Sequence, residues 1–165
     1  MNDNDQNFYM QLAVEQAEIA GLNDDVPVGA IIVHNNQVIA KAYNRRQIDH
    51  NAIAHAEILA IQEACQKLNR WILDDCQLFV TLEPCVMCFG AIVQARIQDV
   101  YFGAYDPKTG ACGSLSDLRN LKSSSINHHT CFHGGILLEV CSEQIKTFFK
   151  KKRLEKSRDN GMEIS

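Results

Sequence analysis

Four residues in this chain have the types and the spacing needed for hydrolytic chemistry on a metal ion. They are His55, Glu57, Cys85 and Cys88, with Pro84 directly before the first cysteine. One imidazole and two thiolates can hold zinc, and a site with three protein ligands keeps a position for water, whereas structural zinc sites are closed by four. A carboxylate two residues from the imidazole can carry protons to and from that water. The pattern therefore indicates a catalytic zinc centre.

The two helices that carry these residues must present them at their ends. We predict helices over about 55–67 and 85–96. The cysteines are three residues apart and share a helix face, but the histidine and the glutamate are two apart and diverge on a regular helix. They can serve one site only if it lies beyond the helix N-terminus. Both positive helix ends would then point at the metal and favour the thiolate form of the cysteines.

The other segments alternate between strand and helix patterns. A helix is predicted over 8–20, with Phe8, Leu12 and Ile19 near one face, and a second over about 136–157. Predicted strands cover 27–34, 37–43, 77–82, 99–103 and 130–133, and a loop rich in Gly, Ser and Asn covers 104–129. This order implies parallel pairing in the middle of the sheet and helices on both faces. We expect one domain over residues 1–165, a three-layer α/β/α arrangement around a mixed five-stranded sheet.

Composition places the chain among cytoplasmic proteins. No stretch of about 18 apolar residues is present, so no membrane span is expected, and the polar, acidic residues 1–7 do not resemble a secretory signal. Seven cysteines, an odd number, suit a reducing compartment in which two bind metal. The other five are expected to be small buried apolar residues: Cys65, Cys76, Cys112, Cys131 and Cys141.

Charge is distributed unevenly along the chain. The net charge is −4, and residues 1–25 contain six acids and no Lys or Arg. Residues 146–158 contain seven basic groups and one acid, a balance of +6, which leaves −10 for everything else. Such a tract can attract a polyanion or simply be the solvated end of a helix, and charge alone leaves both interpretations open.

The chain resembles the bacterial tRNA-specific adenosine deaminases along most of its length. The His-x-Glu and Pro-Cys-x-x-Cys motifs are shared by the wider cytidine-deaminase-like superfamily. Narrower matches are Asp106–Leu115, which reads Asp-x-Lys-Thr-Gly-Ala-x-Gly-Ser-Leu, and Phe148-Phe149 before the basic tract. Further matching segments are 26–30, 43–45, 54–58, 80–88, 96–97 and 102–104.

This resemblance implies a fold, a reaction and a partner. The fold would be cytidine-deaminase-like, and the reaction would be hydrolysis of the wobble adenosine (position 34) of a tRNA anticodon to inosine, with release of ammonia. One Zn²⁺ per subunit would be held by His55, Cys85 and Cys88, with Glu57 as the proton shuttle. The family is homodimeric, with active sites near the subunit interface.

The same resemblance implies residues that bind the substrate. Asn44 would hold the purine through its amide, which offers both a donor and an acceptor. Pro27 and Val28 would pack near the inserted base, and Asp106 and Lys108 would meet the neighbouring anticodon nucleotides.

A cationic surface would contact the anticodon arm, whose loop bases are easily splayed outward. Candidate contacts to the RNA backbone are Arg45, Arg46, Lys150, Lys151, Lys152 and Arg153. Two alternatives stay open at this point. One is a small-molecule guanine or cytosine deaminase of the same superfamily, and the other is a noncatalytic RNA-binding domain stabilised by zinc.

Overall fold

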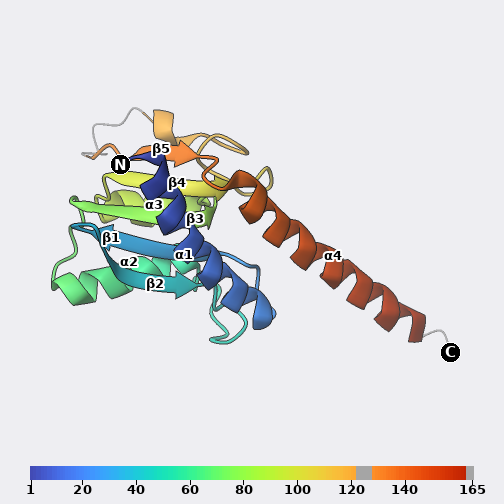
Figure 1. The fold of residues 1–165 in the computed structure, drawn as a ribbon. Helices are drawn as coiled ribbons and strands as arrows, with labels where there is room; N and C mark the ends of the chain where they lie inside the picture. Colours follow the sequence, from blue (N-terminus) through green and yellow to red (C-terminus); the bar gives the residue numbers. More distant parts are fainter. Residues whose placement is uncertain (122–127, 163–165) are drawn as a thin grey trace.

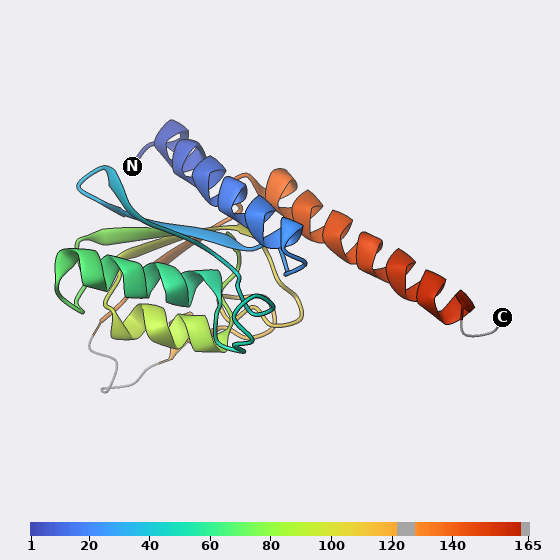
Figure 2. The same cartoon turned by 90° about the horizontal axis from the view of Figure 1, so that it is seen from below.

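The computed structural model describes residues 1–121 and 128–162, and shows three layers around a five-stranded sheet (Figures 1 and 2). Helices α1 (Asp3–Leu22) and α4 (Leu138–Met162) lie on one face, and α2 (Ala56–Leu68) and α3 (Val86–Gln94) on the other. The strands are β1 (Gly29–His34), β2 (Gln37–Tyr43), β3 (Cys76–Leu82), β4 (Asp99–Ala104) and β5 (Cys131–Gly134). The predicted layers and element order are confirmed.

The sheet has the order β2-β1-β3-β4-β5 and mixes both kinds of pairing. Strand β1 is antiparallel to β2 and β3, while β3, β4 and β5 are parallel to one another. The β1–β2 hairpin turns at Asn35 and Asn36, both with positive φ, as a tight two-residue turn requires. This topology places the start of β1 and the ends of β2, β3 and β4 side by side, along the edge of the sheet that runs across the strand ends. Gly29 pairs with Tyr43 and Leu82 with Ala104 at this edge.

Helix α1 begins earlier than its apolar pattern predicts and buries a different face. It starts at Asp3 because the side chain of Asn2 accepts the N–H of Asp5 at 2.9 Å. Phe8 is 61% exposed and Ile19 36%, so the predicted face is wrong. The buried residues are instead Tyr9, Met10, Ala13, Val14, Ala17 and Ala20, and a Cβ at Gly29 would overlap the carbonyl oxygen of Ala13. The helix therefore approaches β1 most closely at Ala13 and Ala17, where the side chains are small.

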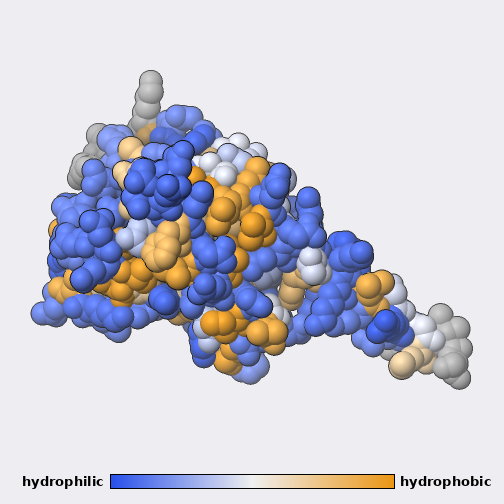
Figure 3. All heavy atoms as spheres, in the orientation of Figure 1, coloured by the Kyte–Doolittle hydropathy of each residue, from blue (hydrophilic) through white to orange (hydrophobic). Residues whose placement is uncertain are grey.

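Helix α4 begins later and runs further than the predicted 136–157. Positive φ values at Gly135 and Leu137 delay its start to Leu138, and it continues to Met162. Its first turns pack on the sheet through Cys141, which lies so close to β4 that a Cβ at Gly103 would overlap its sulfur. Its later turns project away from the sheet (Figures 1 and 2). Their surface is largely hydrophilic (Figure 3).

The predictions for the loop and for the non-ligand cysteines are partly confirmed within the described residues. The loop predicted over 104–129 contains one short 3₁₀ turn, Leu118–Asn120, and its part at 122–127 lies outside the described residues, as do 163–165. Cys76, Cys112 and Cys141 are buried and Cys65 is half-buried. Cys131 is exposed, contrary to prediction, because β5 is an edge strand of the sheet.

Across residues 1–121 and 128–162, no helix has both the length and the apolar character needed to cross a membrane.

Candidate active site

The three predicted metal ligands lie together at the edge of the sheet. His55 Nδ1 is 3.6 Å from Cys88 Sγ and 3.8 Å from Cys85 Sγ, and all three ligand atoms lie within 4.8 Å of one another. Zinc bonds of about 2.3 Å to sulfur and about 2.0 Å to nitrogen, in a tetrahedron, place such atoms roughly 3.5–3.8 Å apart. The donor types and their separations therefore fit a zinc ion.

The histidine lies at the N-terminus of α2 and the two cysteines lie at the N-terminus of α3, as the spacing predicted. His55 is the N-cap of α2 and Cys85 is the N-cap of α3, both with extended backbone and neither with a side-chain capping hydrogen bond. Their side chains are thus available to a ligand rather than to the helix. The Ala56 N–H at the start of α2 is satisfied by Asn44, whose Oδ1 accepts it at 2.9 Å.

Hydrogen bonds within the cluster stabilise the thiolate form of one of its two cysteines. The pKa of Cys85 is lowered to about 4, first because the Cys88 thiol donates a hydrogen bond to it and next because His55 does. The pKa of Cys88 is raised, chiefly by that same hydrogen bond and then by burial. The pKa of His55 is raised mainly by its hydrogen bond to Cys85. One thiolate is therefore already present at neutral pH, and a thiolate is the form that zinc binds.

Glu57 lies buried beside this cluster. Its side chain is 4% exposed, and Oε2 makes no hydrogen bond among the described residues. Burial raises the pKa of its carboxyl to about 7. A buried polar atom without a partner costs free energy, whereas a carboxyl of this pKa exchanges protons readily at neutral pH. These properties suit a proton shuttle.

The predicted substrate-binding residues of the first strands converge on the same edge. Pro27 and Val28 are buried immediately before β1, and the carbonyl oxygen of Val28 accepts the N–H of Asn44 at 3.1 Å. The amide of Asn44 donates to the Val26 carbonyl at 3.2 Å and is 4% exposed. Beside its bonds to Val26 and Ala56, this amide keeps one N–H and one lone pair for a ligand.

The loop after β4 is held directly against the metal-binding segment. Ala111 N–H donates to the carbonyl oxygen of Pro84 at 2.9 Å. The carboxylate of Asp106 accepts the N–H groups of Lys108 and Thr109 at 3.0 and 3.3 Å. Asp106 therefore shapes the turn, while Lys108 is exposed.

The basic residues predicted to contact RNA fall into two groups that the sequence did not distinguish: those already paired with a carboxylate and those that are not. Arg45 makes two 2.9 Å bonds to Asp49, Arg46 approaches the buried Asp25 at 3.4 Å, and Lys152 pairs with Asp24. On the projecting part of α4, Lys151 has only a 3.9 Å contact with Glu155. Lys150 and Arg153 form no ion pair with any described residue.

Two buried carboxylates near the site were missed by sequence reasoning. Asp25 accepts the N–H of Gln47 at 3.0 Å and ties down the loop after β2. Glu83 is 2% exposed and lies just before Pro84. A signal was available, since Glu83 is an acid directly after the mostly apolar strand segment Leu78–Leu82.

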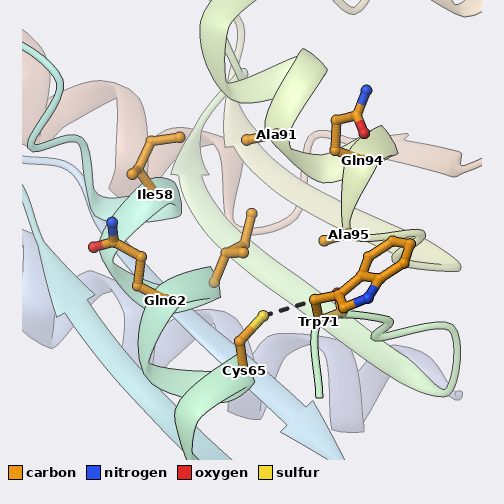
Figure 4. Close-up of a pocket in the computed structure, with 8 residues that line it drawn as sticks. Ile58, Gln62, Cys65, Trp71, Ala91, Gln94 and Ala95 are labelled. Carbon is orange, nitrogen blue, oxygen red and sulfur yellow. Dashed lines mark hydrogen bonds between the residues drawn. The ribbon is translucent and has the colours of Figure 1, made fainter. Parts of the chain in front are cut away.

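A shallow groove of about 320 Å³ lies between α2 and α3, apart from the ligand cluster (Figure 4). Apolar side chains dominate its lining, among them Ile58, Ile61 and Trp71. Trp71 is 61% exposed, and the guanidinium of Arg96 lies 5.6 Å from its ring. None of the three candidate ligands lines this groove.

Comparison with known proteins agrees with this geometry. The family model of the MafB19-like deaminases matches residues 4–153. The tRNA-specific adenosine deaminase of Bacillus subtilis (strain 168) is 43% identical over 149 residues, which cover 90% of this chain and 91% of the relative. The chain belongs to the tRNA-specific adenosine deaminase family. The resemblance inferred from the motifs is thus confirmed.

Solved structures with the same fold include both a tRNA deaminase and small-molecule deaminases. A structure from studies of A-to-I editing by tRNA:A34 deaminases has a TM-score of 0.77 and 39% identity, and the match covers 83% of this chain and 98% of that one. It confirms the cytidine-deaminase-like fold. The guanine deaminase of Nitrosomonas europaea, with a TM-score of 0.70 over 86% of this chain and 83% of its own, is 21% identical and shares the fold alone.

Proposed function

We propose that this enzyme of the tRNA-specific adenosine deaminase family hydrolyses adenosine to inosine at wobble position 34 of tRNA and releases ammonia. The observation that carries the chemistry is the cluster of His55, Cys85 and Cys88 beside Glu57, whose Oε2 has no partner among the described residues. The choice of substrate is supported by a tRNA-specific relative that is 43% identical over 90% of the chain.

We propose that one Zn²⁺ per subunit is held by His55 Nδ1, Cys85 Sγ and Cys88 Sγ. When bound, zinc supplies the Lewis acidity that lets water ionise near neutral pH. Glu57 accepts a proton from the attacking water at Oε2 and delivers it to a ring nitrogen of the base. It then takes the second proton of that water and passes it to the amine, which leaves as ammonia while the C–N bond breaks and a carbonyl forms. Burial keeps the pKa of this carboxyl at about 7, where it can perform both transfers.

The residues that we propose to contact the substrate lie along the same edge of the sheet as the ligand cluster. Asn44 binds the purine through its remaining N–H and lone pair, and Pro27 and Val28 form an apolar wall beside the base. Asp106 and Lys108 belong to the loop that meets the neighbouring anticodon nucleotides. A loop nucleotide suits this buried site because it can be splayed outward at little cost.

A substrate comparison tests the function. An anticodon stem-loop with adenosine at the wobble position is offered beside free adenosine, guanine and cytosine, with inosine and ammonia as the measured products. We expect turnover of the stem-loop alone. Turnover of guanine without the stem-loop would favour the small-molecule alternative, and binding of the stem-loop without any product would favour the noncatalytic one.

We propose that the projecting part of α4 binds the RNA backbone through Lys150, Lys151 and Arg153. Replacing all three with Ala should weaken stem-loop binding and reduce the slope of log Kd against log salt by about 2, since each phosphate contact contributes about 0.7–0.9. Arg45, Arg46 and Lys152 are weaker candidates because their charges already face Asp49, Asp25 and Asp24.

Lys152→Ala is the matched control for this measurement. Its ammonium lies between Asp24 and Glu155, so its removal should leave the salt slope nearly unchanged. Equal slopes for the unmodified protein and the triple variant would show that the basic tract is only a solvated helix surface.

We propose further that residues 1–165 act as one domain and that the enzyme is a cytoplasmic homodimer, as the family resemblance implies. The apolar groove on α2 and α3 offers surface for such association. Sedimentation should give a mass of about 37 kDa, twice the 18.5 kDa of one chain, and a mass of one chain at working concentrations would contradict the dimer.

A further inference from the structure

Glu83 is a buried carboxylate whose hydrogen-bonding capacity is filled by a single loop. It directly follows β3, is 2% exposed and precedes the metal-binding segment that starts at Pro84. Its Oε1 accepts the N–H groups of Cys112 and Ser114, both at 3.0 Å. Its Oε2 accepts the Asp106 N–H at 2.9 Å and the Ser114 hydroxyl.

These contacts set Glu83 apart from the proposed proton shuttle. Both of its oxygens have two donors, whereas Oε2 of Glu57 has no partner among the described residues. A carboxylate that accepts hydrogen bonds from four donors is held in one orientation. Glu83 is therefore suited to hold structure rather than to move protons.

The loop leaves no space around this carboxylate. A Cβ at Gly110 would lie 2.5 Å from the Glu83 carboxyl carbon and 2.5 Å from the carbonyl oxygen of Asp106. The Gly110 carbonyl oxygen also accepts the N–H groups of Leu115 and Ser116, both at 3.1 Å. The loop thus closes on itself around the carboxylate, and the absence of a side chain at position 110 permits this packing.

The same loop is joined to the metal-binding segment on its other side. Gly110 forms an isolated β-bridge with Cys85, and Ala111 N–H donates to the Pro84 carbonyl oxygen at 2.9 Å. Because Glu83 is two residues before Cys85, its four hydrogen bonds fix where Asp106 and Lys108 lie relative to the metal ligands.

We propose that Glu83 is a positioning residue that holds the loop of residues 105–116 in place for the nucleotides flanking the target adenosine. This inference rests on the proposed function and specifies how the site recognises an RNA loop rather than a free base. A preorganised loop spares the complex the entropy cost of ordering it on binding. Loss of Glu83 should therefore weaken recognition of the flanking nucleotides more than it slows the chemical step.

Glu83→Gln tests the proposal because it preserves size while replacing an acceptor oxygen with an NH₂ group. That group would face the N–H donors of the loop, so at least one hydrogen bond between position 83 and the loop is lost. We expect KM for the anticodon stem-loop to rise about tenfold, with a much smaller fall in kcat and unchanged zinc content. Discrimination between stem-loops that differ at the nucleotides flanking position 34 should shrink.

Amide hydrogen exchange provides a readout that needs no activity. In Glu83→Gln, the amides of Asp106, Cys112 and Ser114 should exchange faster, while amides inside β3 stay protected. If the unmodified enzyme does not act on the stem-loop, the proposed function fails, yet these amides still report whether Glu83 holds the loop.

Asp75→Asn is the matched control, since Asp75 lies at the opposite end of β3 and binds His34 and Arg70 instead. It should change neither KM nor exchange in the loop. Gly110→Ala disturbs the same contact while Glu83 stays in place, and it replaces Glu83→Gln if that variant does not fold. It should also raise KM and speed the exchange of the loop amides. The double variant should be no worse than the worse single one.

Three results would overturn the proposal. The first is a folded, zinc-containing Glu83→Gln protein with unchanged KM and unchanged loop exchange. The second is a fall in kcat on every substrate at constant KM, which would make Glu83 a group that acts in the chemical step. The third is loss of zinc while the loop amides stay protected, which would assign Glu83 to the metal site.

Discussion

Replacing Glu57 with Gln is expected to lower turnover of the anticodon stem-loop by at least about 10²–10⁴-fold, the usual contribution of a positioned proton carrier. Gln keeps the size of the side chain but cannot accept or return a proton. The buried position, 4% exposed, and the unpartnered Oε2 leave no other described residue at that oxygen to take over the transfer. Zinc content and thermal stability should stay close to those of the unmodified enzyme, because Glu57 is not among the three candidate ligands.

The measurement is single-turnover formation of inosine, with zinc determined on the same samples. Glu63→Gln is the matched control, since Glu63 lies on the same helix, pairs with Lys67 at the surface and should leave turnover unchanged. If Glu57→Gln formed inosine at the normal rate, the proposed proton transfer would be refuted.

Replacing Cys88 with Ala is expected to abolish zinc binding and, with it, all turnover. The thiol is fully buried and lies 3.6 Å from His55 Nδ1. Its loss leaves two protein ligands where three are needed for a catalytic zinc site. Zinc that binds only the folded state adds its binding free energy to stability, about 4 kcal/mol at 1,000 times the Kd. The variant should lose this contribution.

Thermal unfolding with and without added zinc distinguishes a lost ligand from a lost buried side chain. The midpoint should rise with zinc in the unmodified protein and stay constant in Cys88→Ala. Cys141→Ala, which removes another buried thiol on α4, should lower the midpoint yet keep the zinc response. An unaltered zinc stoichiometry in Cys88→Ala would contradict the proposed ligand set.

Local spacing was sufficient to locate the candidate ligands at two helix ends because helix geometry is local. The separation of His55 and Glu57 by two residues predicts a site beyond a helix end, and His55 is indeed the N-cap of α2. The Asn35-Asn36 turn likewise follows from residues that tolerate positive φ. Such predictions depend only on backbone dihedral angles and on neighbours a few residues away.

The burial of side chains and the pairing of charges were harder to predict from the sequence, because they depend on segments that are distant in the chain. Phe8 is exposed because the face of α1 that packs on the sheet carries Tyr9, Met10 and Ala13 instead. The basic residues looked equivalent in the sequence, but Arg46 faces Asp25 from 21 positions away. No local pattern contains these contacts.

The sequence by itself determined the chemical groups of the site, their placement at two helix ends and the family, because residue type and short-range spacing are properties of the chain. Only the tertiary structure decided which oxygen lacks a partner, which cations are already paired and which loop surrounds Glu83. The physical reason is the sheet topology. It brings the start of β1 and the ends of β2, β3 and β4 to one edge, so that residues more than 50 positions apart, such as Gly29 and Thr81, become hydrogen-bonded neighbours.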